Sequence, residues 1–315
     1  MNIYVNEEEF YSSKALERLK TIGNVKFQKN FKKIKKNFQN THIIFVKLRD
    51  KIDEGFLNKF SNLKYIVCPT TSITHIDKNI CKKRGIKVIK LDKSDLGLKS
   101  IYSTAELTMG LILSLRRNIH RSFYDSKVGK INSRYMYSGH SLNGQTIGII
   151  GIGRIGMMVA KMSKSFNMKI IAYDKIKKKT LPKYIKITKS LQSIFKNSDI
   201  ISLNISDLES NYNFINNKLI QLSKKKPLFI NTSRGNFVDE KSLFKALKNG
   251  ILSGIGLDVL KDEYSDKTIN YLIKTHSDLN LLLTPHIGGC TFNEMKITEE
   301  IVVEKLLRKI RKNEI

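Results

Sequence analysis

The feature that most constrains this chain is a glycine-rich turn between a short apolar run and a helical pattern. Residues 146–150 form the apolar run, and Gly151, Gly153 and Gly156 follow it with the spacing G-x-G-x-x-G. In such a turn the first glycine permits a tight bend, the second lets a pyrophosphate approach the backbone, and the third lets the helix pack on the strand. The N-terminus of the following helix attracts the anion. The turn therefore predicts a parallel α/β sheet that binds a dinucleotide.

An acidic residue at the end of the next predicted strand indicates which dinucleotide binds. Residues 169–173 form that strand, and Asp174 follows it. A carboxylate at this place can accept hydrogen bonds from both adenosine-ribose hydroxyls and repels a 2′-phosphate, so NAD is favoured over NADP. Lys175, Lys177 and Lys178 lie nearby in the sequence and weaken this exclusion. A methyltransferase that binds a different nucleoside is the alternative that the turn leaves open.

Short apolar runs rich in β-branched residues alternate with helical patterns, as expected for parallel strands that are buried on both faces. The predicted strands are residues 3–5, 43–46, 65–68 and 88–91, followed by 146–150, 169–173, 200–203, 228–231, 254–258 and 281–284. The predicted helices are residues 77–84, 103–115 and 294–312, and residues 121–142 are expected to be irregular. We therefore predict an α/β fold of two Rossmann-like or flavodoxin-like domains with parallel sheets and an active site in the interdomain cleft.

The helical run at residues 103–115 separates two alternating stretches and so marks a domain boundary. We place residues 1–100 and 288–315 in a substrate-binding (catalytic) domain, and residues 101–287 in a NAD-binding Rossmann domain. The first domain is then discontinuous, because the last helix of the chain returns to it.

The charge balance is strongly basic, with 57 Lys and Arg against 28 Asp and Glu and a formal net charge of +29. Such a balance raises nucleic acid or an acidic membrane surface as a partner. The lysines form only short, scattered runs, and Arg, which reads phosphates and guanine edges, is much rarer. We therefore interpret most of the charge as solvated surface that attracts small anions. A nucleic-acid surface stays an alternative, which salt-resistant binding to heparin would support.

Cysteine use and apolar runs indicate the compartment. Cys68, Cys81 and Cys290 form no C-x-x-C pair, which is typical of a reducing cytoplasm, and no metal site is predicted. No apolar run approaches the roughly 18 residues that a membrane span needs, and the N-terminus lacks a signal-peptide pattern. We therefore expect a cytoplasmic protein without a membrane partner.

Polar clusters follow three of the later strands, at the edge where ligands of such sheets bind. They contain Arg234, Glu263 and His286. Taken singly, these are an ordinary surface cation, a solvated carboxylate and a structural histidine. Together they supply what hydride transfer between NAD and a 2-hydroxy acid requires. The arginine can bind the carboxylate and polarise the keto oxygen, the histidine can exchange the hydroxyl proton, and the glutamate can orient the imidazole.

The motifs, taken in order, resemble those of one known family, the D-isomer-specific 2-hydroxyacid dehydrogenases. The matching segments are S-T-A-E-L-T at residues 103–108, residues 139–151, N-T-S-R-G at residues 231–235, L-D-V at residues 257–259 and T-P-H-I-G-G at residues 284–289. The family includes D-3-phosphoglycerate, glyoxylate/hydroxypyruvate and D-lactate dehydrogenases. The resemblance covers nearly the whole chain. It implies an NAD-dependent oxidoreductase that transfers a hydride between nicotinamide and C2 of a D-2-hydroxy acid or 2-keto acid.

The resemblance also implies roles for individual residues. Arg234, Glu263 and His286 would be the catalytic trio. The cofactor-binding residues would be Gly151, Gly153, Arg154, Ile155, Gly156, Asp174, Thr232, Ser233, Asp258, Gly288 and Gly289, with Thr71 and Thr108 on the nicotinamide side. The substrate-binding residues would be Arg49, Ser72, Ile73 and Arg234. A small anionic 2-hydroxy or 2-keto acid is the expected partner, and a homodimer is the expected assembly.

The chain departs from the family pattern around the substrate. The loop at residues 70–77 lacks the usual glycines, although its backbone N–H groups hold the substrate carboxylate in the family. Asn204-Ile205-Ser206 stands where the family has His-x-Pro. Lys47 and Arg49 follow the second predicted strand, where phosphoglycerate enzymes place cations for the substrate phosphate. 3-Phosphoglycerate and small keto acids such as hydroxypyruvate or glyoxylate therefore stay alternatives.

Two further expectations concern regulation and class. The chain leaves no room for the C-terminal regulatory domain of long phosphoglycerate dehydrogenases, so we expect a short form of the phosphoglycerate dehydrogenase type. A protein of a different class, an NAD(H)-sensing binding module or corepressor on the same fold, stays an alternative. A sensor would not need the Arg, Glu and His together, which favours the enzyme.

Overall fold

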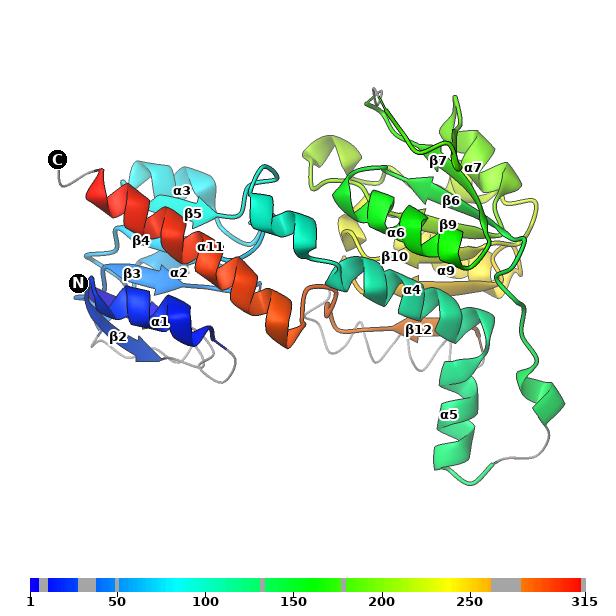
Figure 1. Ribbon diagram of the computed structural model, residues 1–315, viewed down its shortest axis with the longest axis horizontal. Coiled ribbons are helices and arrows are strands. Elements are labelled where there is room, and N and C mark those ends of the chain that lie inside the picture. Colours follow the sequence, from blue (N-terminus) through cyan, green and yellow to red (C-terminus); the bar gives the residue numbers. More distant parts are fainter. Residues whose placement is uncertain are drawn as a thin grey trace. The chain divides into compact units, whose positions relative to one another are not determined.

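We analysed a computed structural model, which describes residues 1–5, 11–27, 38–48, 51–130, 134–176, 180–261 and 279–312. The chain divides into two compact units, unit 1 (Met1–Ile101 with Cys290–Ile315) and unit 2 (Tyr102–Gly289). Each unit contains one parallel sheet with helices on both faces (Figure 1). The two parallel sheets confirm the predicted α/β class. The assignment of substrate binding to the first unit stays a prediction.

Unit 1 is built on a five-stranded parallel sheet. Its strands, in spatial order, are β2 (Asn24–Phe27), β1 (Asn2–Val5), β3 (Ile43–Phe45), β4 (Tyr65–Cys68) and β5 (Lys87–Lys90). Its helices are α1 (Ser13–Lys20), α2 (Glu54–Leu57), α3 (Lys78–Lys83), the 3-10 helix η4 (Leu96–Ser100) and α11 (Phe292–Arg311). The last helix, drawn in red in Figure 1, thus joins a unit whose other elements come from the first hundred residues.

Two apolar layers cover the faces of this sheet, because successive side chains of a strand point to opposite faces. In β3, Ile43 and Phe45 pack in the layer that contains α1 and α11, whereas Ile44 packs in the layer that contains α2 and α3. From α11, Val302 and Leu306 are fully buried in the first layer. The returning helix therefore supplies part of the core of unit 1.

Unit 2 is built on a seven-stranded parallel sheet. Its strands, in spatial order, are β12 (Leu281–Leu283), β11 (Gly254–Leu257), β10 (Leu228–Asn231), β9 (Ile200–Leu203), β6 (Thr146–Ile150), β7 (Lys169–Tyr173) and β8 (Ile185–Ile187). The order reverses between β6 and β9, and ligands of doubly wound sheets bind at such a switch point.

Helices cover both faces of this second sheet. They are α4 (Ser103–Arg116) and α6 (Arg154–Ser165) on one face, and α7 (Leu191–Asn197), α8 (Asn217–Ile220) and α9 (Glu240–Lys248) on the other, with the short 3-10 helices η6 (Glu209–Asn211) and η7 (Gly235–Phe237) in loops. In β6, Ile147 and Ile149 face the layer of α4 and α6, and Ile150 faces the opposite layer. The glycine turn at the end of β6 therefore starts from a strand fixed on both faces.

Four elements differ from the sequence-based prediction. The expectation that residues 121–142 are irregular is wrong for its first part, because α5 (Ile119–Lys127) extends into it and η5 (Arg134–Tyr137) lies further on. No residue of α5 is buried, so its apolar side chains do not mark a core-facing stripe. The strands β2 and β8 were not predicted. Both are edge strands with mostly polar or exposed positions, unlike the doubly buried inner strands.

Candidate active site

The glycine turn after β6 brings a helix N-terminus close to the sheet. Gly151 has a φ of +90°, and a Cβ added there would lie 2.6 Å from a backbone oxygen of the β9 loop. A Cβ added at Gly156 would lie 2.1 Å from the carbonyl oxygen of Gly151, so only glycine lets α6 pack this closely. A Cβ added at Gly153 would meet no described atom within 4 Å. Arg154 and Ile155 then open α6, so the turn leaves space for an anion at the helix N-terminus.

Asp174 ties the end of β7 to this turn. Its Oδ2 accepts a hydrogen bond from the backbone N–H of Ile152 at 2.9 Å, and its Oδ1 accepts one from the N–H of Ile176 at 2.9 Å. A carboxylate oxygen can accept more than one hydrogen bond. The same carboxylate can therefore also accept hydrogen bonds from the ribose hydroxyls that the sequence assigns to it.

The neighbouring cation, Lys175, is held by groups on another loop. Its Nζ donates to the Oδ1 of Asn211 at 3.0 Å and lies 4.4 Å from the ring centre of Phe214. Lys177 and Lys178 lie outside the described residues. Three lysines were expected to weaken the preference for NAD. Of these, Lys175 lies in the described part of the chain, and it contacts an amide oxygen and an aromatic ring.

Two hydroxyls meet between α4 and the end of β10. Thr108 donates its hydroxyl proton to the carbonyl oxygen of Thr104 at 2.8 Å, and its Oγ1 lies 2.9 Å from the Oγ1 of Thr232. Because a hydroxyl has one proton, Thr232 must donate to Thr108. The structure therefore brings together two residues assigned separately to the cofactor site, and both are buried.

The turn that carries Arg234 is fixed by a buried asparagine at the end of β10. The Oδ1 of Asn231 accepts from the N–H of Ser233 at 2.9 Å, and its Nδ2 donates to the carbonyl oxygen of Arg234 at 2.9 Å. The hydroxyl of Ser233 donates to the carbonyl oxygen of Leu203 at 2.7 Å, which anchors the turn to β9. These hydrogen bonds therefore fix the backbone conformation of residues 231–234, which carries the guanidinium.

The guanidinium of Arg234 has two described partners. Nη1 donates to the carbonyl oxygen of Ser233 at 2.6 Å, and Nε lies 3.5 Å from the Oδ2 of Asp207. The side chains of Arg234 and Asp207 are 26% and 17% exposed, so this is a partly desolvated pair rather than a free surface contact. Asp207 is not among the predicted site residues, since nothing in its local sequence pattern indicates a partner from another strand end.

A second buried carboxylate fixes the turn that carries His286. Asp258, which is 1% exposed, follows β11. Its Oδ1 accepts from the hydroxyl of Thr284 at 2.7 Å and from the N–H of Ile287 at 2.8 Å, and its Oδ2 accepts from the N–H of Gly288 at 2.8 Å. Burial raises the pKa of Asp258 above its ordinary value, while these hydrogen bonds and the nearby His286 oppose the rise.

His286 sits at the bend of this turn. Its φ is +56°, a left-handed conformation that is uncommon for a residue with a Cβ. Its N–H donates to the carbonyl oxygens of Asp258 at 2.9 Å and Thr284 at 3.0 Å. A Cβ at Gly288 would lie 2.9 Å from the Oδ2 of Asp258, whereas one at Gly289 would meet no described atom within 4 Å. The backbone strain therefore lies at the predicted proton-transfer residue.

Three predicted ligands lie in unit 1, on the loop after β4. Thr71 is exposed, whereas Ser72 and Ile73 are 8% and 5% exposed. The hydroxyl of Thr70 donates to the carbonyl oxygen of Ser72 at 2.5 Å. The contact of their backbone N–H groups with a ligand, which the resemblance implies, stays a prediction. Glu263 and Arg49 lie outside the described residues.

Lys47, considered as a phosphate ligand, contacts a buried acid instead. Its Nζ lies 3.6 Å from the Oε1 of Glu299, whose side chain is 0% exposed. The Oε2 of Glu299 accepts from the N–H of Ser12 at 2.9 Å. A buried carboxylate needs compensation by charge and hydrogen bonds, and Lys47 supplies part of it.

Comparison with known proteins decides the family. Residues 109–288 match the family described as "D-isomer specific 2-hydroxyacid dehydrogenase, NAD binding domain". A hydroxypyruvate reductase from Thermotoga maritima is 35% identical over 270 residues, which are 85% of this chain and 84% of that protein. The chain belongs to the D-isomer specific 2-hydroxyacid dehydrogenase family.

Two other proteins are similar to this dehydrogenase. A D-3-phosphoglycerate dehydrogenase from Methanocaldococcus jannaschii is 30% identical over 301 residues, which are 94% of this chain but 55% of the relative. The crystal structure of the D-lactate dehydrogenase from Aquifex aeolicus, complexed with NAD and lactic acid, has a TM-score of 0.83 at 30% identity and covers 99% of this chain. The protein is thus an NAD-dependent D-2-hydroxyacid dehydrogenase by family, fold and cofactor domain.

The described residues of this dehydrogenase fit NAD. The open face of Gly153 and the N-terminus of α6 suit a pyrophosphate, and Asp174 keeps acceptor capacity for ribose hydroxyls. All three groups lie at the carboxyl ends of the neighbouring strands β6 and β7. The roles of the individual site residues stay predictions.

Proposed function

We propose that this dehydrogenase reduces hydroxypyruvate, or a 2-keto acid of similar size, to the D-2-hydroxy acid, with Arg234, Glu263 and His286 as its catalytic groups. One observation supports the proposal: the turns that contain Arg234 and His286 are both fixed by hydrogen bonds and lie at the same edge of one sheet. Asn231 holds the turn of Arg234, and Asp258 holds the turn of His286. The N–H of Asp258 donates to the carbonyl oxygen of Asn231 at 3.0 Å, so the two turns are joined directly.

Each group has a distinct task in this reaction. Arg234 binds the substrate carboxylate through a bidentate fork and polarises the keto oxygen. The protonated His286 donates a proton to that oxygen during reduction, and the neutral imidazole takes it back during oxidation. The carboxylate of Glu263 orients the imidazole and stabilises its protonated form. When bound, the cofactor would supply the hydride for C2 as NADH during reduction, and as NAD it would accept the hydride during oxidation.

Hydroxypyruvate is preferred to its phosphorylated counterpart on two grounds. The hydroxypyruvate reductase is the relative that matches 84% of its own length, whereas the phosphoglycerate dehydrogenase is matched over 55%. Lys47, a candidate phosphate ligand, lies 3.6 Å from the buried Glu299 and compensates that charge. A phosphate group on the substrate would therefore have one cation fewer to bind it, because Lys47 is already paired with Glu299.

The first test is NADH consumption by the purified protein with hydroxypyruvate, phosphohydroxypyruvate, glyoxylate and pyruvate. We expect the highest kcat/KM with hydroxypyruvate. His286→Ala and Arg234→Ala should each lower turnover by at least about 100-fold, because each removes a group that acts in the transition state. NADH affinity should stay within about 3-fold in both variants.

Other outcomes assign other functions. A clear preference for phosphohydroxypyruvate would overturn the substrate proposal but keep the dehydrogenase. Normal turnover in either variant would overturn the assigned catalytic groups. NADH binding without turnover on any keto acid, unchanged by His286→Ala, would favour the sensing module instead.

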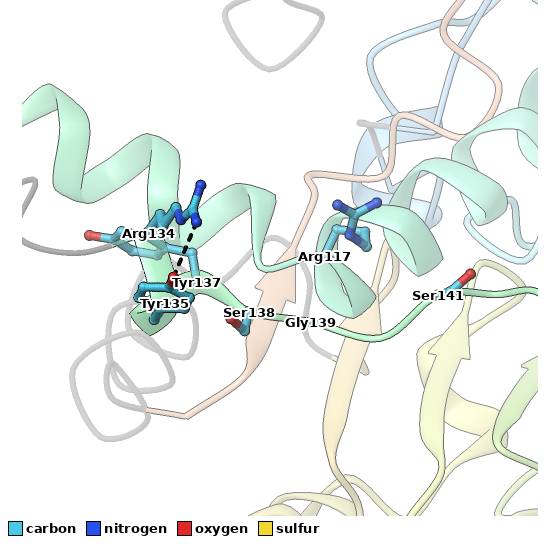
Figure 2. A pocket seen from close by; sticks show the side chains of 7 residues that line it. All are labelled: Arg117, Arg134, Tyr135, Tyr137, Ser138, Gly139 and Ser141. Carbon is cyan, nitrogen blue, oxygen red and sulfur yellow. Dashed lines mark hydrogen bonds between the residues drawn. The ribbon is translucent and has the colours of Figure 1, made fainter.

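We propose that the enzyme is a homodimer formed through residues 119–130 and 134–136, which together we name the arm. The arm exposes six large apolar side chains: Ile119 50%, Phe123 67%, Tyr124 66%, Val128 47%, Tyr135 71% and Met136 65%. A cluster of this kind on a soluble surface is typical of a protein contact. Figure 2 shows Tyr135 from η5 beside Arg134, lining a pocket of about 560 Å³ that also involves Arg117.

Light scattering should give twice the chain mass of 36.2 kDa. The double variant Phe123→Ser/Tyr124→Ser should shift the protein towards a monomer, because it removes apolar area from the contact. Phe166→Ser, at a 40% exposed site outside the arm, is the matched control and should stay dimeric. A monomeric parent protein would contradict the proposal.

We propose a cytoplasmic location. All three cysteines are free, and Cys68 and Cys81 are buried as thiols, which suits a reducing compartment. Within the described parts of the chain, no helix combines the length and the apolar character needed to cross a bilayer.

A further inference from the structure

Asp207 lies against the guanidinium that the proposed reaction needs. It follows β9, directly after the segment Asn204-Ile205-Ser206 that departs from the family pattern. Its Oδ2 is 3.5 Å from the Nε of Arg234, and the two side chains are 17% and 26% exposed. Arg234 reaches the site from the neighbouring strand β10. A carboxylate from one strand end thus meets the cation from the next.

The segment that carries Asp207 is held in place by buried amides. The Nδ2 of Asn211, a residue 5% exposed, donates to the carbonyl oxygen of Ser206 at 2.8 Å. The Oδ1 of Asn211 accepts from Lys175 at 3.0 Å. At the other end, the Nδ2 of Asn204 donates to the Oγ of Ser202 at 2.9 Å. The carboxylate of Asp207 is therefore presented from a fixed loop.

The two contacts of the guanidinium involve Nε and one proton of Nη1. A guanidinium has five N–H groups in a rigid plane. Nε forms an ion pair with the Oδ2 of Asp207 at 3.5 Å, and one Nη1 proton goes to the carbonyl oxygen of Ser233. Among the described residues, the remaining three N–H groups, on Nη1 and Nη2, meet no acceptor. They form the terminal fork, which matches the two oxygens of a carboxylate.

We propose that Asp207 is a positioning residue, which holds the Nε edge of Arg234 so that its terminal fork faces the substrate carboxylate. This inference rests on the proposed role of Arg234. Without an acceptor at position 207, the guanidinium can rotate about its last side-chain torsions and lose the bidentate geometry. Orientation of this kind is worth large rate factors, because a displaced group no longer meets the transition state.

The test compares variants that keep or remove the acceptor. Asp207→Ala should lower kcat/KM for the keto acid at least 10-fold, with KM for NADH within 2-fold of the parent. Asp207→Asn should recover at least half of the parent kcat/KM, because the amide oxygen can still accept from Nε. Asp207→Leu keeps the volume and serves as a second acceptor-free variant. Glu209→Ala removes an exposed carboxylate of the same loop and should have no effect.

The outcomes separate this inference from the proposed function. If the parent is active and Arg234→Ala is not, but Asp207→Ala retains parental kcat/KM, the positioning role is overturned alone. Equal losses in the Asn and Ala variants, or a matching loss of NADH affinity, would also overturn it, since they would indicate a charge effect or a loop defect. An inactive parent, or an active Arg234→Ala variant, would instead overturn the proposed function on which the inference rests.

Discussion

A single buried carboxylate shapes the turn that presents His286. Asp258 accepts three hydrogen bonds from the segment Thr284–Gly288, and burial raises its pKa. A carboxyl whose folded-state pKa is raised stabilises the fold below its unfolded pKa, and this stabilisation is lost as pH rises through the folded pKa. At a pH above its folded-state pKa, the ionised Asp258 therefore lowers the free energy of unfolding. This loss of stability occurs at a position where the turn needs one acceptor for three hydrogen-bond donors.

The variant Asp258→Asn should lower turnover by about 100-fold while leaving the melting temperature at neutral pH close to that of the parent. The amide nitrogen cannot accept from an N–H, so two donors would face each other and the turn of His286 would open. Steady-state kinetics and thermal unfolding measure both effects.

Asp199→Asn is the matched control for this variant. Asp199 also accepts from a backbone N–H, that of Thr146 at 2.8 Å, but at the opposite end of β6. It should keep its turnover. Parental turnover in Asp258→Asn would show that the carboxylate does not set the position of His286.

Some residues of the candidate site have a signal in the sequence and others do not. Arg234 and His286 each follow an apolar strand within a recognisable motif, so their order along the chain indicates them. Asp207 and the partner of Lys47 lack such a signal. Their contacts join residues far apart in sequence, Asp207 with Arg234 and Lys47 with Glu299. Only the folded arrangement reveals these pairs.

At the level of elements, the inner strands were predictable and the edges were not. An inner parallel strand is covered on both faces and reads as a continuous apolar run, as β4 and β9 do. An edge strand such as β2 has alternating exposed positions and a much weaker signal. The helix α5 was missed for a related reason. Ile119 and Phe123 have the i, i+4 spacing of a helix, but no residue of α5 is buried, so this pattern does not mark a face of the core.

Two glycines of the β6–α6 turn should respond differently to alanine. Gly156→Ala should lower the melting temperature, because its Cβ would lie 2.1 Å from a backbone oxygen and would push α6 away from the strand. Gly153→Ala should leave the melting temperature unchanged but weaken NADH binding at least 10-fold, since its Cβ would occupy the open space over the helix N-terminus.

Thermal unfolding and NADH titration of both variants test whether Gly156 affects stability and Gly153 affects cofactor binding. Gly110→Ala is the control, because this glycine lies inside α4 with open space at its Cβ. It should gain roughly 0.5–1 kcal/mol of stability. Unchanged NADH affinity in Gly153→Ala would argue against a pyrophosphate at this turn.

At the level of the whole molecule, the net charge of +29 should act on the substrate before binding. A positive field raises the local concentration of an anionic keto acid and is screened by salt. The screening length falls from about 10 Å at 0.1 M to about 3 Å at 1 M ionic strength. We expect kcat/KM for hydroxypyruvate to fall several-fold over this range, while kcat at saturating substrate stays within about 2-fold.

Initial-rate kinetics over a salt series measure this effect, with kcat as the internal control. A kcat/KM that is independent of salt would show that the charge is not felt at the active site. Heparin chromatography is the companion measurement. Elution at moderate salt fits a diffuse charge, whereas retention at high salt would support the nucleic-acid alternative.

The discontinuity of unit 1 has a consequence for biosynthesis. Val302 and Leu306 of α11 pack in the same core layer as Ile3 and Ile43, yet the ribosome must make all of unit 2 between them. At 5–20 residues per second, translating a unit of this size takes roughly 10–40 s. During that interval one face of the first sheet has α1 but lacks α11. Unit 2 can therefore fold before unit 1 is complete, and the nascent chain presents an apolar surface that chaperones can bind until α11 emerges.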